Sequence, residues 1–296
     1  MEKLDLVQKI GNVDFELTYS CNLDCLHCYN PQYGKTKEFS TNEIVELTKE
    51  LKLARFQEIH YNGGEPLIRT DIYAILNNSN HLGLKTLLET NATLLDPQQV
   101  SGLQNLTIRA SIDGSEKIHN IIRRSKLENA YRTTLTNLAK AKELGVSVQI
   151  NCSVNKINSA SIYQMVKEVL EYGLDDIRLR LTMPTGSAIS NWDKLKMGKG
   201  HLDFIGKEVE EISKDFPEVK LNYSSLRRGI PKFEPKFFID PMGFVKPYPF
   251  IECSVGNLRE SSVEKILQSI HEFKLPSKDE IRMISYLESI GMISKK

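Results

Sequence analysis

Cysteine is scarce in this sequence: five of the 296 residues are cysteine, and three of the five fall within positions 21–28. The chain also lacks an apolar run long enough to span a bilayer, and its first residues lack the apolar core of a signal peptide. We therefore expect a cytoplasmic protein with no membrane partner. In that compartment thiols stay reduced, and clustered cysteines bind metal or serve catalysis more often than they form disulfides.

A charge imbalance is absent as well. The chain has 39 Lys and Arg residues against 38 Asp and Glu residues, for a formal net charge of +1. Because no basic excess is present, we expect no nucleic-acid partner. With 40% apolar and 26% charged residues the composition is that of a globular protein, and the length suffices for one large α/β domain with a small extension.

The clustered cysteines are Cys21, Cys25 and Cys28, separated by gaps of three and then two residues. This spacing lets three thiolates converge on one metal centre and leaves a fourth coordination position open. A structural zinc site has four protein ligands, and an electron-transfer iron–sulfur cluster has four cysteines. The triad therefore indicates a metal centre that binds a further ligand. A non-catalytic zinc protein with His27 or His60 as fourth ligand is the alternative.

Strand-like and helix-like segments alternate through the first two thirds of the chain. Ser40 and Glu43 form the capping-box pattern of a helix start, and Gly145 and Gly173 stop two later helices. Six strands each followed by a helix predict parallel β/α units. The predicted strands are residues 13–18, 58–61, 84–90, 106–112, 146–154 and 176–181, and the clearest helices are 130–144 and 162–172.

The unusual sequences follow the ends of the first four predicted strands. In parallel β/α folds the chemistry lies at the carboxyl ends of the strands, so these motifs share one rim. They are the cysteine loop, Asn62-Gly63-Gly64-Glu65-Pro66, Thr90-Asn91-Ala92 and Ser111-Ile112-Asp113-Gly114.

The Cys-x3-Cys-x2-Cys loop after the first strand and Gly-Gly-Glu-Pro after the second resemble the radical S-adenosylmethionine (radical SAM) superfamily, over residues 13–260. The resemblance implies an α/β fold, a partial (β/α)6 TIM-type barrel. It implies one 4Fe–4S cluster on Cys21, Cys25 and Cys28, with S-adenosylmethionine on the fourth iron. One electron from an external donor, a flavodoxin or ferredoxin, then cleaves S-adenosylmethionine. The resulting 5′-deoxyadenosyl radical removes hydrogen from a small-molecule or peptide substrate.

The same resemblance implies the positions that contact S-adenosylmethionine. The backbone at His27 would meet the adenine, the Gly-Gly-Glu-Pro turn the methionine amino group, and Arg123 the carboxylate. Where the family pattern has Thr-Asn-Gly, this chain has Ala92, and an alanine there suggests a less demanding backbone. The implied cofactor-binding residues are His27, Gly63, Gly64, Glu65, Pro66, Asn91, Ser111, Asp113, Arg123 and Asn151.

The character of the chain changes after residue 215. We predict a barrel over residues 1–215 and a β-turn-rich extension over 216–296 that ends in helices near 262–270 and 278–290. Residues 239–266 resemble the SPASM or twitch extension of peptide- and sugar-modifying radical SAM enzymes, as does Pro184-Thr185-Gly186. Those extensions carry auxiliary-cluster cysteines, whereas this one has only Cys253, and Cys152 falls on a predicted strand. We therefore expect an extension without a cluster.

A missing auxiliary cluster favours redox-neutral outcomes such as epimerisation. Cys253 is then a candidate catalytic hydrogen donor, because some radical SAM epimerases quench the substrate radical with a cysteine thiol. A vestigial cluster ligand or a small buried hydrophobe is the other interpretation of Cys253. A maturase that crosslinks or oxidises a ribosomal peptide is an alternative function. Only about a dozen residues precede the first strand, so we expect no fused leader-peptide domain.

Overall fold

One continuous sheet organises the part of the chain that this computed structural model describes, which is residues 3–30, 36–223, 235–247 and 253–274. Its strands run in the order β10-β9-β8-β1-β2-β3-β4-β5-β6-β7, and the pairs from β8 to β7 are all parallel. Their bounds are β1 Val13–Glu16, β2 Glu58–Asn62, β3 Lys85–Thr90, β4 Leu106–Ser111, β5 Ser147–Val154, β6 Asp176–Leu181, β7 Lys220–Asn222, β8 Phe237–Ile239, β9 Phe244–Lys246 and β10 Gly256–Asn257.

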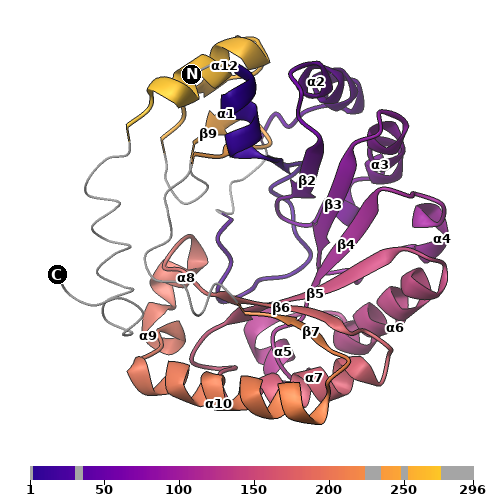
Figure 1. Cartoon of the computed structure of the whole chain (residues 1–296), viewed down its shortest axis with the longest axis vertical. Helices are drawn as coiled ribbons and strands as arrows, with labels where there is room; N and C mark the ends of the chain where they lie inside the picture. The colour runs from indigo at the N-terminus through magenta and orange to yellow at the C-terminus, as the bar shows by residue number, and fades with distance from the viewer. Residues whose placement is uncertain (1–2, 31–35, 224–234, 248–252, 275–296) are drawn as a thin grey trace.

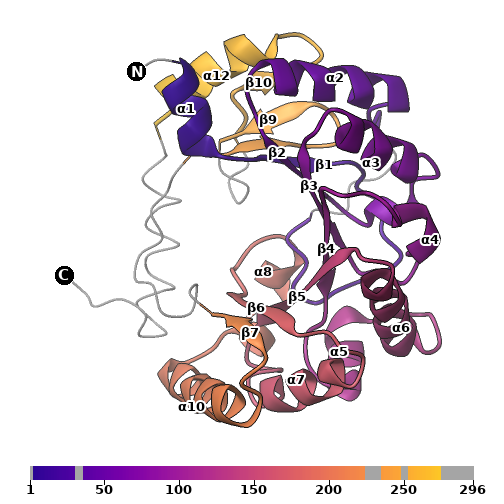
Figure 2. The same ribbon diagram turned by 45° about the vertical axis from the view of Figure 1, so that its right-hand side comes forward.

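Helices cover the convex side of this curved sheet (Figures 1 and 2), so β1 to β6 and their helices form the expected partial (β/α)6 barrel. Among the described residues, no helix is long and apolar enough to cross a membrane. The helices are α1 Lys3–Ile10, α2 Thr41–Leu53, η1 Pro66–Ile68, α3 Ile72–His81, α4 Pro97–Val100, α5 Glu116–Arg123, α6 Ala130–Glu143, α7 Ile162–Leu170, α8 Ser187–Ser190, α9 Trp192–Leu195, α10 Lys199–Asp215 and α12 Val263–Glu272.

Local sequence signals account for many of these boundaries. The Ser40 side chain caps α2 and Glu43 bonds back to the Ser40 backbone, which confirms the predicted capping box. Gly145 and Gly173 follow α6 and α7 with φ of +86° and +71°, the left-handed conformation that ends helices. All six predicted strands are confirmed, with ends that move by one or two residues; the first stops at Glu16 instead of residue 18.

Alternation along the strands separates the core from the concave face. On β6, Ile177 and Leu179 are buried in the apolar core, while the intervening Arg178 and Arg180 retain solvent contact. Because successive side chains in a strand point to opposite faces, the polar residues of β1 to β6 line the concave face. The centre of the barrel is therefore polar and charged.

The C-terminal segment continues the barrel sheet at its β1 edge. β8 pairs in parallel with β1, and β9 and β10 add two antiparallel strands (Figure 2). α12 confirms the helix predicted near residues 262–270, whereas the helix predicted at 278–290 lies outside the described residues. The division into domains at residue 215, where α10 ends, stays a prediction.

Candidate functional site

The cysteine loop, residues 17–30, leaves β1 and is held along its length by backbone hydrogen bonds. Gly64 N–H donates to Thr18 O (2.7 Å), and Glu65 N–H donates to Ser20 O (2.8 Å). Further along, Leu26 N–H donates to Ile122 O at the end of α5 (2.9 Å). The loop is thus fixed from two sides of the barrel rim.

Glycines allow this close approach. A Cβ atom on Gly64 would lie 2.2 Å from Ser20 O, and one on Gly63, which has a φ of +124°, would lie 2.5 Å from Thr18 O. Both distances are shorter than any real Cβ contact, so the two glycines let the β2 turn pack on the cysteine loop. The sequence suggested that they serve the ligand instead, and this packing role was not foreseen.

A third glycine, Gly186, was missed by sequence reasoning. Its φ is +51°, and a Cβ there would lie 2.5 Å from Cys28 O. The next residue, Ser187, donates its N–H to the same Cys28 oxygen at 2.8 Å. The signal that marks this contact is Pro184-Thr185-Gly186 directly after β6, which places a turn at the same rim.

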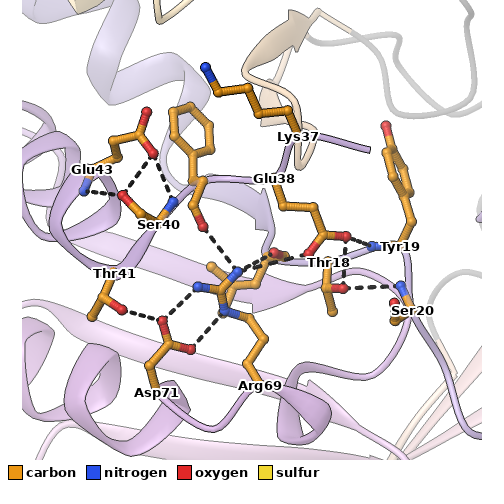
Figure 3. Close-up of polar contacts among 12 residues, drawn as sticks. Thr18, Tyr19, Ser20, Lys37, Glu38, Ser40, Thr41, Glu43, Arg69 and Asp71 are labelled. Carbon is orange, nitrogen blue, oxygen red and sulfur yellow. Dashed lines mark hydrogen bonds and ion pairs between the residues drawn. The ribbon is translucent and has the colours of Figure 1, made fainter. Parts of the chain in front are cut away.

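An arginine network secures the start of the cysteine loop (Figure 3). Arg69 donates from Nε and Nη2 to the two carboxylate oxygens of Asp71 (2.9 and 2.6 Å), and from Nη1 to Leu17 O and Phe39 O (3.1 Å each). Glu38 accepts hydrogen bonds from Thr18 Oγ1 and Tyr19 N–H, both at 2.9 Å. These contacts tie the end of β1 to the start of α2. They border a pocket of about 380 Å³ lined by Thr18, Ser20, Glu38, Thr41, Ile68, Arg69, Thr70 and Asp71.

Asp113, at the rim after β4, is fully buried and bonded only to protein groups. Its Oδ1 accepts from Ser153 N–H (2.7 Å), and its Oδ2 accepts from Arg123 Nε (2.6 Å) and lies 3.2 Å from His27 Nε2. Burial alone would raise the pKa of this carboxyl, but the charges of Arg123 and His27 hold it well below its usual range. Asp113 therefore orients Arg123 and His27, and its predicted ribose contact stays a prediction.

Arg123 connects this buried ion pair to the cysteine loop. Its Nη1 lies 3.8 Å from Cys25 Sγ, within the range of an N–H···S hydrogen bond. Burial raises the pKa of the Cys25 thiol to about 12 and that of Cys21 to about 11, so both are neutral thiols in the metal-free protein. Metal binding must then release these protons, as thiolate ligation always requires.

Glu65 and Asn91 also bond within the protein. Glu65 Oε1 accepts from Thr90 Oγ1 (2.6 Å) and Oε2 accepts from Asn91 N–H (2.7 Å), which joins the β2 turn to the end of β3. The Asn91 amide donates to Asn22 Oδ1 in the cysteine loop (2.8 Å). Ala92 has a φ of +55°, so the inference of a less demanding backbone was wrong: this alanine holds the conformation that glycine adopts most readily.

Ser111 and Asn151 lie side by side on β4 and β5 and face the concave side. The strand register continues this row to Arg178 on β6. Pro66, in contrast, is buried at the first position of η1, where it fixes the turn after Glu65. The cofactor contacts predicted for Ser111, Asn151 and Pro66 stay predictions.

Several buried polar atoms near the cysteine loop lack a hydrogen-bond partner in the described part of the chain. They are Glu16 Oε1, Asn62 Oδ1, His27 Nδ1 and both amide atoms of Asn30. Burial raises the pKa of Glu16 to about 8, so this carboxyl holds its proton at neutral pH. Buried polar groups are normally bonded, and this set fits a polar ligand such as S-adenosylmethionine beside the loop.

A zinc site is the alternative role for the thiols of the loop. In the residues that the structure covers, no three His, Cys, Asp or Glu side chains gather around one point that could hold a single metal ion. A tetrahedral zinc ion needs its ligands at one centre, whereas the irons of a cluster each take one thiolate. Three thiolates with an open fourth position match a 4Fe–4S cluster whose fourth iron takes another ligand. His27, offered as a fourth zinc ligand, bonds to Asp113, and His60 bonds to Asp14 and Glu58.

The remaining cysteines lie elsewhere. Cys152 is fully buried in the core on β5, as the sequence indicated, and burial holds its pKa well above the usual value. Cys253 is partly exposed and precedes β10 at the sheet edge.

The comparisons with known proteins agree with this site. The family model for the radical SAM superfamily matches residues 15–169. The AdoMet-dependent heme synthase of Methanosarcina barkeri is 25% identical over 303 residues, covering 91% of this chain and 86% of that protein. The PqqA peptide cyclase of Bradyrhizobium diazoefficiens is 26% identical over 201 residues, covering 66% of this chain and 53% of that protein.

Solved structures share the fold. Streptococcus suis SuiB bound to its precursor peptide SuiA matches with a TM-score of 0.74 and 15% identity, covering 98% of this chain and 72% of that one. Native anSMEcpe with bound AdoMet matches with a TM-score of 0.71 and 15% identity, covering 88% and 82%. The family model spans more than half of the chain, and with the cysteine loop held at the barrel rim it leads to one conclusion: the chain is an enzyme of the radical SAM superfamily, which uses a 4Fe–4S cluster and S-adenosylmethionine.

Proposed function

We propose that this enzyme abstracts a hydrogen atom from a peptide or small polar metabolite and returns one, a redox-neutral change such as epimerisation. The proposal rests on the number and positions of the cysteines. Apart from Cys21, Cys25 and Cys28, the chain has only Cys152, buried in the core, and Cys253. Two separated cysteines do not supply the ligands of a second 4Fe–4S cluster, so no auxiliary centre on this chain takes up an electron from the substrate.

The position of Cys253 supports the hydrogen-return step. β10 runs in the same direction as β1, because β9 is antiparallel to β10 and to β8, and β8 is parallel to β1. Cys253 precedes β10 and therefore lies toward the amino-terminal end of the barrel strands, whereas the cysteine loop follows their carboxyl ends. Return of a hydrogen from this thiol to the face opposite abstraction, which would invert a stereocentre, requires a substrate that reaches from the rim toward this end of the barrel.

The proposed reaction balances in hydrogen atoms and electrons when a flavodoxin or ferredoxin is the reductant. When bound, the cluster and S-adenosylmethionine use one electron from a flavodoxin or ferredoxin to supply a 5′-deoxyadenosyl radical, releasing methionine. The hydrogen taken from the substrate carbon ends in 5′-deoxyadenosine, and the hydrogen returned to that carbon comes from the Cys253 S–H. A second electron and a proton from solvent restore the thiol. Arg123 and Asp113 hold Cys25 and His27 in place throughout.

Reconstitution under anaerobic conditions tests the catalytic step. Wild-type protein should bind about four irons per chain and release 5′-deoxyadenosine with dithionite and S-adenosylmethionine. The C21A/C25A/C28A variant should lose both the iron and the product. Iron near twice this amount, or iron retained in the triple variant, would contradict a single cluster.

Deuterium labelling tests the outcome. The enzyme is incubated in D2O with the peptide and small-molecule fraction of the source cells, and mass spectra are compared with those of the Cys253→Ala variant. A product that gains one deuterium in wild type and not in the variant supports thiol return. A product that has lost two hydrogens, or that is crosslinked, would contradict the redox-neutral proposal.

A peptide maturase is the second candidate. It is favoured by relatives named for peptide substrates, the PqqA peptide cyclase and the mycofactocin maturase MftC of Mycobacterium tuberculosis, each 26% identical. Both matches cover about two thirds of this chain or less, and 53% and 47% of those proteins. The crosslinked product in the same spectra would identify this function.

A further inference from the structure

Two arginines on the concave face of the barrel are not used by the cluster or by the predicted cofactor contacts. Arg178 and Arg180 lie two residues apart on β6, and their side chains therefore leave the strand on the same side. Leu179 and Ile177, between and before them, are buried in the apolar core, so the arginines leave β6 on the opposite face. The helices cover the convex side of the sheet (Figure 1), and that opposite face is therefore the concave one.

The other charged groups near this face already have partners. Arg109 donates to Glu89 (2.9 Å) and to Gln149 (2.7 Å), and the carboxylate of Asp176 accepts from Gln149 (2.9 Å). Across the barrel, the carboxylate of Asp14 bonds to His60 at 3.1 Å. Each of these acids has a hydrogen-bond partner among the described residues, and Glu89 and Asp176 act on Arg178 through their charge without forming an ion pair with it.

Arg178 and Arg180, in contrast, make no ion pair with any residue that the structure describes. Burial and the charges of Arg180 and Arg109 lower the pKa of Arg178 to about 10, and the opposing effect of the Glu89 and Asp176 carboxylates is smaller. Arg178 is half-buried and Arg180 is exposed, and two neighbouring guanidinium groups without an ion pair among the described residues make this part of the inner wall a candidate anion site.

The strand register shows how far along the barrel Arg178 and Arg180 lie, and this position bears on which ligand they could bind. Arg178 is in register with Asn151 and Ser111, and Arg180 is in register with Ser153, whose N–H bonds to Asp113. The arginines are therefore at the height of the rim site, on the β6 wall across from Glu16 on β1. A ligand group bound here would lie on the same wall, and at the same level, as Ser111 and Asn151.

We propose that Arg178 and Arg180 bind a carboxylate of the substrate and so select for acidic molecules. The inference rests on the proposed function and adds the substrate class. Two guanidinium forks on one strand can each form paired hydrogen bonds to a carboxylate, a geometry that lysine does not reproduce. The protonated Glu16 and the Asn62 amide oxygen on the opposite wall would meet neutral polar parts of the same molecule.

Binding of two carboxylate probes tests the proposal and separates the sources of the carboxylate. The probes are iron coproporphyrin III and an acetylated Gly-Glu-Ala-Glu-Gly peptide amide, each measured against the reconstituted enzyme with S-adenosylmethionine present. The matched Gly-Gln-Ala-Gln-Gly peptide is the neutral control. At least one acidic probe should bind wild type, and R178Q and R180Q should each weaken it by about 10- to 100-fold. If the variants lose affinity for only one of the two probes, that probe identifies whether the carboxylate belongs to a tetrapyrrole or to a peptide.

Three control measurements make the result decisive. Arg132→Gln removes an exposed arginine paired with Glu116 and should leave probe affinity unchanged. R178K keeps the charge without the fork and should lose affinity, though less than R178Q. Circular dichroism melting confirms that each variant is folded.

Several results would contradict the proposal that Arg178 and Arg180 bind a substrate carboxylate. The proposal is wrong if wild type binds neither acidic probe, if R178Q and R180Q bind them as wild type does, or if the glutamine peptide binds equally well. Weaker S-adenosylmethionine binding in both variants would assign the pair to the cofactor and also overturn it. Wild type that releases 5′-deoxyadenosine but binds neither probe overturns only this inference; wild type that binds a probe but releases none overturns only the proposed function.

Discussion

At the scale of single residues, the chemistry of the rim depends on carboxyl groups that burial and neighbouring charge drive in opposite directions. Asp113 and Glu16 are both buried, at 0% and 2% exposure. Asp113 keeps its charge because Arg123 and His27 bond to it, whereas Glu16 keeps its proton because desolvation outweighs its other contacts. The two acids therefore offer one fixed anion and one proton donor within the same rim.

Replacing Asp113 by Asn should destabilise the protein by about 3–5 kcal/mol, because the buried Arg123 charge loses its partner. Urea unfolding at pH 7 measures the change. Glu116→Gln, which breaks an exposed pair with Arg132, is the matched control and should shift stability by less than about 1 kcal/mol. Equal effects of the two substitutions would show that Asp113 is not the anchor described above.

Glu16 gives the folded state a pH dependence of defined sign. The folded carboxyl stays protonated up to a pKa of about 8, while the unfolded one ionises near its ordinary pKa of 4.5. The unfolded state therefore binds fewer protons between these values, and stability falls as pH rises from 4.5 to 8.

Glu16→Gln should remove this dependence. The variant should match wild type near pH 4.5 and become more stable than wild type by on the order of 4 kcal/mol at pH 8. Urea unfolding of both proteins at several pH values tests this. A stability difference that stays constant with pH would mean that Glu16 titrates normally.

At the scale of elements, the cysteine loop is an irregular segment whose shape is imposed by its neighbours. The β2 turn, the end of α5 and the start of α8 each donate a backbone N–H to it or accept one from it. Arg69 and Glu38 fix the residues just before Cys21 (Figure 3). The shape of the loop therefore depends on contacts from these neighbouring elements.

Gly64→Ala should destabilise the protein by about 3 kcal/mol or more and reduce the iron bound on reconstitution, because its Cβ would overlap Ser20 O. Gly206→Ala is the matched control. Gly206 is exposed in α10 with no atom within 4 Å of an added Cβ, so this change should stabilise the protein by about 0.5–1 kcal/mol. Thermal melting and iron analysis report both effects, and normal iron content in Gly64→Ala would refute the packing role.

At the scale of the whole molecule, the cluster joins segments that the fold brings to one rim. Removing it with a chelator and an oxidant should lower the melting temperature by several degrees, because a ligand that binds only the folded state stabilises it. Hydrogen exchange should accelerate at the amides of Leu26, Cys28 and Ser187. Unchanged exchange there after iron loss would show that the loop is rigid without metal.

The sequence was sufficient to predict the features of this molecule that depend on local signals. Ser40, Gly145 and Gly173 set helix ends through their own side chains or φ angles, and the cysteine spacing led to the family that the comparisons confirm. The sequence was not sufficient to predict contacts between backbone segments that are far apart in the sequence. The fit of Gly64 against Ser20, and the pairing of β8 with β1, depend on three-dimensional neighbours. Ala92 shows the same limit, because its left-handed φ is imposed by its surroundings.

The parallel pairing of β8 with β1 has a consequence for how the chain acquires its structure during synthesis. β1 ends at Glu16 and β8 begins at Phe237, so at 5–20 residues per second the ribosome needs roughly 10–45 s to make the partner of that edge. During this interval the β1 edge lacks its native partner on that side and is open to pairing with other chains. Low temperature during expression, which slows such association, should therefore raise the yield of folded enzyme.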